Sequence, residues 1–150
     1  MIAALLFVLA ASMPPEFARF RAEARLTRPP AKPDVRTGRA RMFRTRLREE
    51  AAEGANFNGH YRVAMWGCGS NCIEWAVIDL VTGRVWMAPE PVMSCAHSSS
   101  DVDWMELHIG SSLLYVHRCE GGQDRTFDRR RVYVWRGGEP HLLREERLGD

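Results

Sequence analysis

The chain contains almost no lysine. Lys32 is its only lysine, and the other 20 of its 21 basic residues are arginine. A G+C-rich coding sequence produces this bias as readily as phosphate recognition does, so it is no argument for nucleic-acid binding. Charge is also uneven: residues 1–50 carry 11 basic and 5 acidic side chains, whereas residues 51–150 carry 10 and 14. We expect no nucleic-acid partner.

The sequence also lacks an apolar run long enough to span a membrane. Ile2 to Ala11 is uninterrupted but has only 10 residues, whereas a transmembrane helix needs about 20. Ser12, Met13 and two prolines follow, a pattern typical of the apolar region and cleavage site of a signal peptide. We therefore expect residues 1–12 to be a signal peptide, the protein to be periplasmic or secreted, and no stable membrane insertion after cleavage.

Two features of this end leave alternatives open. A signal peptide normally begins with basic residues, and none precedes Ile2, which a misassigned start codon would explain. The run could instead form a buried N-terminal helix that Pro14 and Pro15 cut short. No cysteine lies in the run or directly after it, so we expect no lipid anchor there.

Familiar catalytic and metal-binding signatures are missing. There is no G-x-S-x-G motif for a hydrolase nucleophile and no H-x3-H pair, and the C-x3-C spacing of Cys68 and Cys72 is not the usual zinc spacing. His108 and His117 are predicted on facing strands of one hairpin, where a packed pair is commoner than a ligand pair. We expect no metal ion, no cofactor and no catalytic residue.

Two weaker alternatives to that expectation remain. Zinc could be held by the two cysteines together with some of the five histidines, His60, His97, His108, His117 and His141. Acid chemistry could use the loop residues His97, Ser98, Ser99, Ser100, Asp101 and Asp103 with Glu106. A solvated loop explains these loop residues better than a hydrolase site does.

Four cysteines in a short exported chain predict two disulfides. Of the three connectivities we favour Cys68 with Cys72, which are local across a glycine-rich turn, and Cys95 with Cys119. The alternative is a reactive thiol in the Gly67–Cys72 turn with His60 as its base.

Hydrophobic periodicity predicts an α+β, mainly β fold. Ala40, Phe43, Leu47 and Ala51 recur at helical spacing between Gly38 and Glu53, with Thr37 as N-cap and Gly54 as the stop. About seven strands follow, in an antiparallel meander that forms a twisted sheet or a small open barrel. The predicted strands are Tyr61–Trp66, Cys72–Leu80, Val85–Met87, Trp104–Ile109, Leu113–Cys119, Arg131–Arg136 and His141–Arg147. Cys72–Leu80 is apolar on both faces and is expected to be central.

We divide the chain into the signal peptide, a Pro- and Arg-rich arm over residues 13–37 and one globular domain over residues 38–150. The arm is either a mobile leader or an extended strap over the domain, and its two phenylalanines favour some docking. A short helix is predicted within Glu16–Leu26.

One stretch organises the rest of the chain. N-F-N-G-H-Y (Asn56–Tyr61) and W-G-C-G-S-N-C (Trp66–Cys72) are followed by a D-x-x-T-G turn at Asp79–Gly83. This combination, over roughly residues 40 to 88, resembles an uncharacterised family of small exported bacterial proteins with no assigned activity. The resemblance implies export and no catalytic roles.

These observations favour a non-enzymatic binding or inhibitor module of the periplasm, with a protein or a cell-envelope component as its partner. The alternative is a small thiol- or zinc-dependent enzyme that uses the Cys68/Cys72 turn. The binding residues are expected on the two turns, at Asn58, His60, Arg62, Ser70 and Asn71, although both turns could simply redirect the chain.

The five tryptophans are expected in the core or at its rim rather than as a carbohydrate-stacking platform. Trp66 and Tyr61 are expected to be buried. The oligomeric state is left open.

The first prediction concerns maturation. The mature protein is expected to begin near Met13 and to contain no free thiol, because export removes the leader and oxidises the cysteines. Intact mass after alkylation without reduction measures both. Four alkylated cysteines in protein recovered from the periplasm would contradict the disulfide argument and the compartment derived from it.

Overall fold

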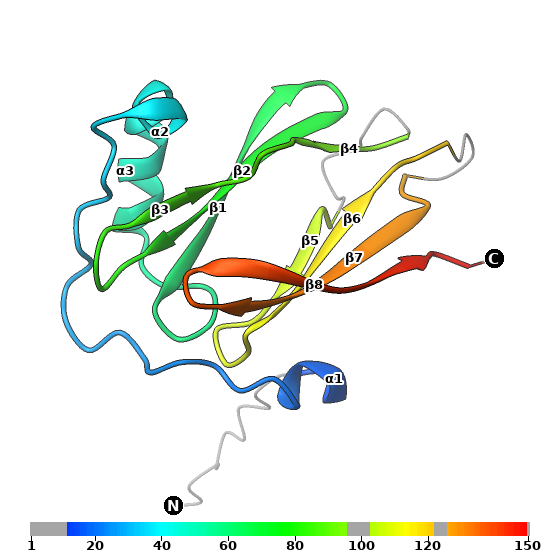
Figure 1. The fold of residues 1–150 in the computed structure, drawn as a ribbon, viewed down its shortest axis with the longest axis horizontal. Helices are drawn as coiled ribbons and strands as arrows, with labels where there is room; N and C mark the ends of the chain where they lie inside the picture. Colours follow the sequence, from blue (N-terminus) through cyan, green and yellow to red (C-terminus); the bar gives the residue numbers. More distant parts are fainter. Residues whose placement is uncertain (1–11, 96–102, 122–125, 150) are drawn as a thin grey trace, which may run out of the picture.

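The structure is a computed structural model that describes residues 12–95, 103–121 and 126–149. The predicted signal peptide, except Ser12, lies outside these residues, as do His97, Ser98, Ser99, Ser100 and Asp101. The described chain forms two four-stranded antiparallel sheets (Figure 1). The first contains β1 (Tyr61–Gly69), β2 (Cys72–Asp79), β3 (Val85–Met87) and β4 (Val92–Met93), and the second contains β5 (Met105–Leu107), β6 (Leu113–Arg118), β7 (Arg129–Arg136) and β8 (Glu139–Arg147). The predicted mainly β, antiparallel class is confirmed.

Strand β2 is the centre of the first sheet, as its two apolar faces predict. It pairs with β1 on one side and with both β3 and the unpredicted β4 on the other. Its residues Trp75 and Val77 face the second sheet, whereas Ala76 and Ile78 lie in a separate cluster with the helices. A strand buried on both faces must be apolar on both, which is why this segment shows no polar alternation.

The predicted helix is present in two pieces, α2 (Gly38–Met42) and α3 (Arg44–Ala52). Phe43 interrupts it, with φ −104° and ψ 21°, and its ring lies 4.9 Å from that of Trp66. Thr37 occupies the N-cap position without a side-chain capping bond, and Gly54 follows the last turn with φ +87°. Periodicity alone does not predict the break, because Phe43 keeps the helical spacing.

The two sheets pack face to face through aromatic side chains. Trp135 on β7 is 2% exposed, and its ring centroid lies 6.1 Å from Phe57, 5.7 Å from Tyr61 and 5.6 Å from Trp86. All three partners belong to the first sheet or to the turn before it. Aromatic pairs at these separations are favourable in edge-to-face geometry.

Part of the outer face of the second sheet is covered by α1 (Pro15–Ala18), which lies below that sheet in Figure 1. Phe17 is 1% exposed and packs with Leu113, Tyr115 and Val132. The layers therefore run from α2 and α3 through the first sheet and the second sheet to α1.

The arm is a strap over the domain, one of the two alternatives. The backbone N–H groups of Leu26, Ala31 and Asp34 donate to the carbonyl oxygens of Gly59, Leu80 and Gly83 at 3.2, 2.8 and 2.7 Å. A Cβ added to Gly59 would lie 2.2 Å from the Glu23 carbonyl oxygen, and one on Gly83 would lie 2.2 Å from that of Lys32. Both positions require glycine, because the arm backbone fills the space that a side chain would need.

Both predicted disulfides are confirmed. Cys68 and Cys72 join the ends of β1 and β2, with Cα atoms 5.1 Å apart, and Cys95 and Cys119 join the segment after β4 to the end of β6 at 5.2 Å. Two disulfides indicate an oxidising environment outside the cytoplasm. Among the described helices, none is long and apolar enough to cross a bilayer.

Tyr61 and Trp66 are buried, as predicted, at 4% and 8% exposure. Replacing Trp66 by alanine is expected to lower the free energy of unfolding by about 3–5 kcal/mol, the range for large core truncations. Urea denaturation followed by circular dichroism measures this.

Met65→Ala is the matched control, because Met65 is the preceding strand residue and is 37% exposed. We expect it to cost below about 1 kcal/mol. Equal losses in the two variants would show that the burial of Trp66 does not determine the cost.

Candidate functional site: a cavity beneath the arm

The residues predicted to bind a ligand fall at two ends of one hairpin. Asn58 and His60 precede β1, whereas Ser70 and Asn71 lie in the turn between β1 and β2. The nine residues of β1 separate the two groups, which is roughly 30 Å at about 3.3 Å per residue. The structure therefore brings Asn58 and His60 together and places Ser70 and Asn71 elsewhere.

Asn58 ties the arm to the turn. Its side chain is fully buried, accepts a hydrogen bond from the Glu23 backbone N–H at 2.9 Å, and donates to the Glu23 carboxylate at 3.4 Å. Its φ of +44° is one that asparagine tolerates better than most residues. The Asn58 side chain thus holds the arm to this turn through two hydrogen bonds to Glu23.

His60 continues the same contact. Its Nδ1 donates to the Ala24 carbonyl oxygen at 2.8 Å, and its Nε2 lies 3.4 Å from the Glu23 carboxylate and 3.6 Å from that of Asp79. The ring is stacked on Tyr61 with centroids 4.4 Å apart. His60 therefore lies between two carboxylates that are far apart in sequence.

Arg62 contacts α3 rather than the arm. It points to α3 and pairs with Glu50, with Nη2 3.0 Å from the carboxylate. A second hydrogen bond goes from Arg62 to the Gly54 carbonyl oxygen at 3.5 Å. These contacts hold α3 to the first sheet.

A cavity of about 340 Å³ lies beside Tyr61. We call it the arm cavity, because the arm supplies one wall and the β2–β3 and β7–β8 turns supply others. Its lining residues are Glu23, Tyr61, Val77, Asp79, Thr82, Arg84, Trp86, Trp135, Gly137 and Gly138. Its volume is at the lower end of the range typical of small-molecule sites, about 300–1,000 Å³.

Some polar groups of this cavity have hydrogen-bond partners in the protein, and others do not. Burial, followed by the Glu23 and Asp79 carboxylates, raises the pKa of Tyr61 to about 12, so its hydroxyl remains a donor at neutral pH. The Trp135 indole N–H lies close enough to the Tyr61 hydroxyl to act on it as a hydrogen-bond donor, which lowers the Tyr61 pKa. Within the described residues, however, the Trp135 Nε1–H group meets no acceptor at hydrogen-bond geometry. A buried donor without a partner costs about 1–3 kcal/mol.

Two further cavities are less suited to a polar ligand. One of about 210 Å³ lies between the sheets beside Trp86 and Tyr133, and its arginines Arg118 and Arg131 already pair with glutamates. The other, of about 490 Å³, lies along the seam between arm residues 30–33 and α3. Of these three cavities, the arm cavity combines a guanidinium without an ion pair among the described residues, that of Arg84, with aromatic walls.

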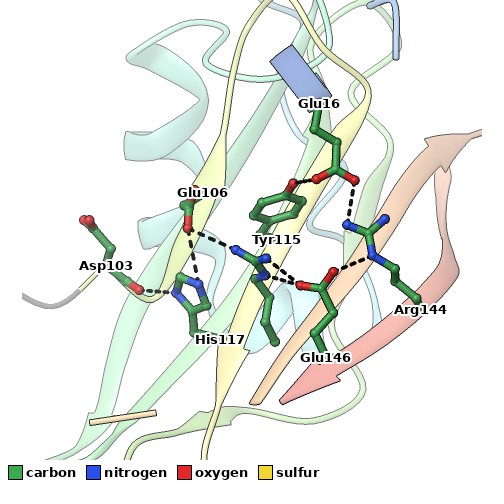
Figure 2. A network of polar contacts seen from close by, with 8 residues as sticks. Glu16, Asp103, Glu106, Tyr115, His117, Arg144 and Glu146 are labelled. Carbon is green, nitrogen blue, oxygen red and sulfur yellow. Dashed lines mark hydrogen bonds and ion pairs between the residues drawn. The ribbon is translucent and has the colours of Figure 1, made fainter. Parts of the chain in front are cut away.

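A polar network covers the outer face of the second sheet (Figure 2). The Tyr115 hydroxyl donates to Glu16, which also accepts from Arg144 at 2.6 Å, and Arg144 in turn donates to Glu146 at 2.5 Å. Arg130 donates to the same Glu146 at 2.8 Å.

Within this network, each charged side chain contacts one of opposite charge. The Tyr115 hydroxyl and the Arg144 guanidinium lower the pKa of the Glu16 carboxyl, while burial and the Glu16 contact raise the pKa of Tyr115 to about 12. Arg144 and Arg130 likewise lower the pKa of Glu146. Each charge is matched by an opposite one, which is typical of a structural clip between α1 and β8 rather than of a reactive centre.

The histidines of the second sheet do not form a ligand pair. His117 Nδ1 donates to the Asp103 carbonyl oxygen at 2.6 Å, and its Nε2 lies 3.3 Å from Glu106 (Figure 2). His108 instead packs edge-on against Phe17. They lie at the two ends of the β5–β6 hairpin, not opposite each other.

The cysteines bear on the alternative of a thiol or zinc enzyme. In the described part of the chain every cysteine is in a disulfide, so Cys68 offers no thiolate for catalysis. The possible ligand atoms of Cys95, Cys119 and Asp128 lie within 4.8 Å of one another, as in a metal site. Both sulfur atoms, however, are joined in the second disulfide.

Most residues of the arm cavity are not marked as site residues by the sequence pattern. The sequence pattern identifies Asp79 only as part of the D-x-x-T-G turn, Glu23 only as part of the arm, and Trp135 only as a core candidate. The signal in the sequence for this region is a strand tryptophan two positions before the glycine pair Gly137-Gly138. Comparison with protein-family models, with curated proteins and with solved structures finds no match to this chain.

The stabilisation that Glu16 gains from Tyr115 and Arg144 is expected to depend on pH. The folded-state pKa of Glu16 lies below its unfolded value near 4.5, so its stabilisation is present above that pH and is lost as pH falls through the folded-state pKa. Glu16→Gln is therefore expected to cost about 1 kcal/mol at pH 7, because the contact is partly exposed, and less near pH 3.

Urea denaturation at the two pH values measures the difference. The control is Glu49→Gln, whose carboxylate lies 3.9 Å from Arg46 in an exposed pair and should cost below about 0.5 kcal/mol at either pH. A Glu16→Gln cost that does not change with pH would contradict the electrostatic role.

Proposed function

We propose that the protein is a non-enzymatic binding module that is exported to the periplasm or secreted, and that it recognises a component of the bacterial cell envelope through the arm cavity. The resemblance of its N-F-x-G-H-Y and W-G-C-G-x-x-C motifs to small exported bacterial proteins supports the compartment. The two disulfides support a location outside the cytoplasm.

The observation that carries the proposal is the Trp135 indole N–H. Trp135 is 2% exposed, lines the arm cavity, and has no hydrogen-bond acceptor within the described residues. Buried donors in folded proteins are almost always paired. The Trp66 indole N–H is also unpaired among the described residues, but only Trp135 of the two lines one of the three cavities described above, where a ligand can supply the acceptor.

The walls of the cavity also support binding rather than turnover. Asn58 and His60 fix the arm, and both sheets contribute rigid strands, so the polar groups are held in place before a ligand arrives. Cys68, the nucleophile of the rival enzyme, is oxidised and is not among the lining residues.

Tyr61→Phe tests this proposal, because it removes one hydroxyl from the cavity and keeps the ring. The immobilised variant is expected to capture at least about 3-fold less of the envelope component than the unmodified protein does. Quantitative mass spectrometry of captured material measures the loss, and the component should be released with unchanged mass.

Tyr133→Phe is the matched control, since Tyr133 lines the smaller cavity and not the arm cavity. It should capture normally. Unchanged capture by Tyr61→Phe, a loss confined to Tyr133→Phe, or release of a chemically altered component would each count against the proposal.

A further inference from the structure

The arm cavity presents hydrogen-bond acceptors and donors side by side. Glu23 and Asp79 supply carboxylates, whereas Trp135 and Arg84 supply N–H donors. The Glu23 carboxylate lies 3.3–3.4 Å from the Tyr61 hydroxyl and 3.4 Å from the Asn58 amide. These contacts are longer than the usual 2.7–3.0 Å, about the range of good hydrogen bonds, so the oxygens retain capacity for a closer donor.

The donors are similarly available. The Trp135 N–H has no acceptor within the described part of the chain. Arg84 has no ion pair there either, in contrast to Arg118 and Arg131 of the smaller cavity. A ligand that fits must therefore accept from Trp135 and Arg84 and donate to Glu23 and to Asp79, whose Oδ1 already accepts from the Val81 backbone N–H at 2.9 Å.

Aromatic rings form the apolar part of the wall. Trp86 is only partly buried, and its ring lies at 87° to that of Trp135, with centroids 5.6 Å apart. Tyr61 lies edge-on to Trp135 at 5.7 Å. Such rings pack against the C–H face of a ligand whose rim is polar.

The charged side chains of the arm cavity distinguish between anionic, cationic and neutral ligands. An anion would meet the two carboxylates, and a cation would meet Arg84 and would leave the Trp135 N–H without an acceptor. A neutral ligand whose hydroxyl groups both donate and accept meets all four requirements at once. A cavity of about 340 Å³ suits one or two sugar rings rather than a long chain.

From this combination we infer that the arm cavity is a carbohydrate-binding site that takes a mono- or disaccharide unit. The ring stacks on the aromatic wall, its hydroxyls donate to Glu23 and Asp79, and a ring or hydroxyl oxygen accepts from the Trp135 N–H. The inference rests on the proposed function, because it names the ligand class of the same cavity.

The test uses the full mature protein labelled with ¹⁵N and follows the indole N–H signals of its five tryptophans. The Trp135 signal is assigned by through-bond correlation, so that no core variant is needed. The probes are maltose, cellobiose, lactose and N,N′-diacetylchitobiose, with choline as a cationic and inorganic phosphate as an anionic comparison.

At least one saccharide is expected to shift the Trp135 signal with a Kd of about 1 mM or tighter, and choline and phosphate are not. Glu23→Gln and Asp79→Asn should each weaken that saccharide about 10-fold or more, the usual effect of losing a charged acceptor. Glu90→Gln, on a carboxylate of the smaller cavity, should leave the affinity unchanged.

Several outcomes overturn the inference. These are no shift with any saccharide at about 20 mM, well above that expected Kd, a shift produced by choline or phosphate alone, or weakening by Glu90→Gln equal to that by Glu23→Gln. If no saccharide binds but envelope capture still depends on Tyr61, the carbohydrate assignment falls and the proposed function stands. If capture does not depend on Tyr61, the proposed function falls whatever the saccharides do.

Discussion

The burial of Trp135 between the two sheets is the constraint on which the remaining structure depends. Its ring contacts Phe57, Tyr61 and Trp86, and through them it fixes how the second sheet lies on the first. The same packing places its N–H where no protein acceptor reaches within the described residues. Apolar burial of a large indole outweighs one unpaired donor, so the fold tolerates an unsatisfied group at the point where the arm cavity opens.

Periodicity and turn chemistry were enough to predict the sheets. Val85–Met87 has the predicted bounds, and the apolar faces of Cys72–Leu80 correctly indicated a central strand. The local disulfide followed from four-residue spacing across a glycine-rich turn. These features depend on neighbouring residues, which is why one sequence sufficed.

The arm cavity depends on contacts between distant residues, and these were not predictable. Glu23 and Tyr61 are 38 positions apart, and Trp135 is a further 74 along the chain. Their proximity follows from the angle between two sheets and from the path of a proline-rich arm. The break at Phe43 was hidden for a related reason, since its contact with Trp66 decides the helix geometry.

The position of the arm has a consequence for biosynthesis. Ser111 donates to the Phe17 carbonyl oxygen across 94 positions, and Arg144 contacts Glu16 across 128. The α1 end of the arm is therefore made early, but the strands that it contacts are complete only when the last hairpin exists, whereas Leu26, Ala31 and Asp34 dock on residues up to Gly83. Contacts this remote in sequence slow folding, because long loops must close before any contact is gained. The α1 segment thus gains its full set of contacts only when synthesis is almost complete, although the rest of the arm can be held by the first sheet earlier.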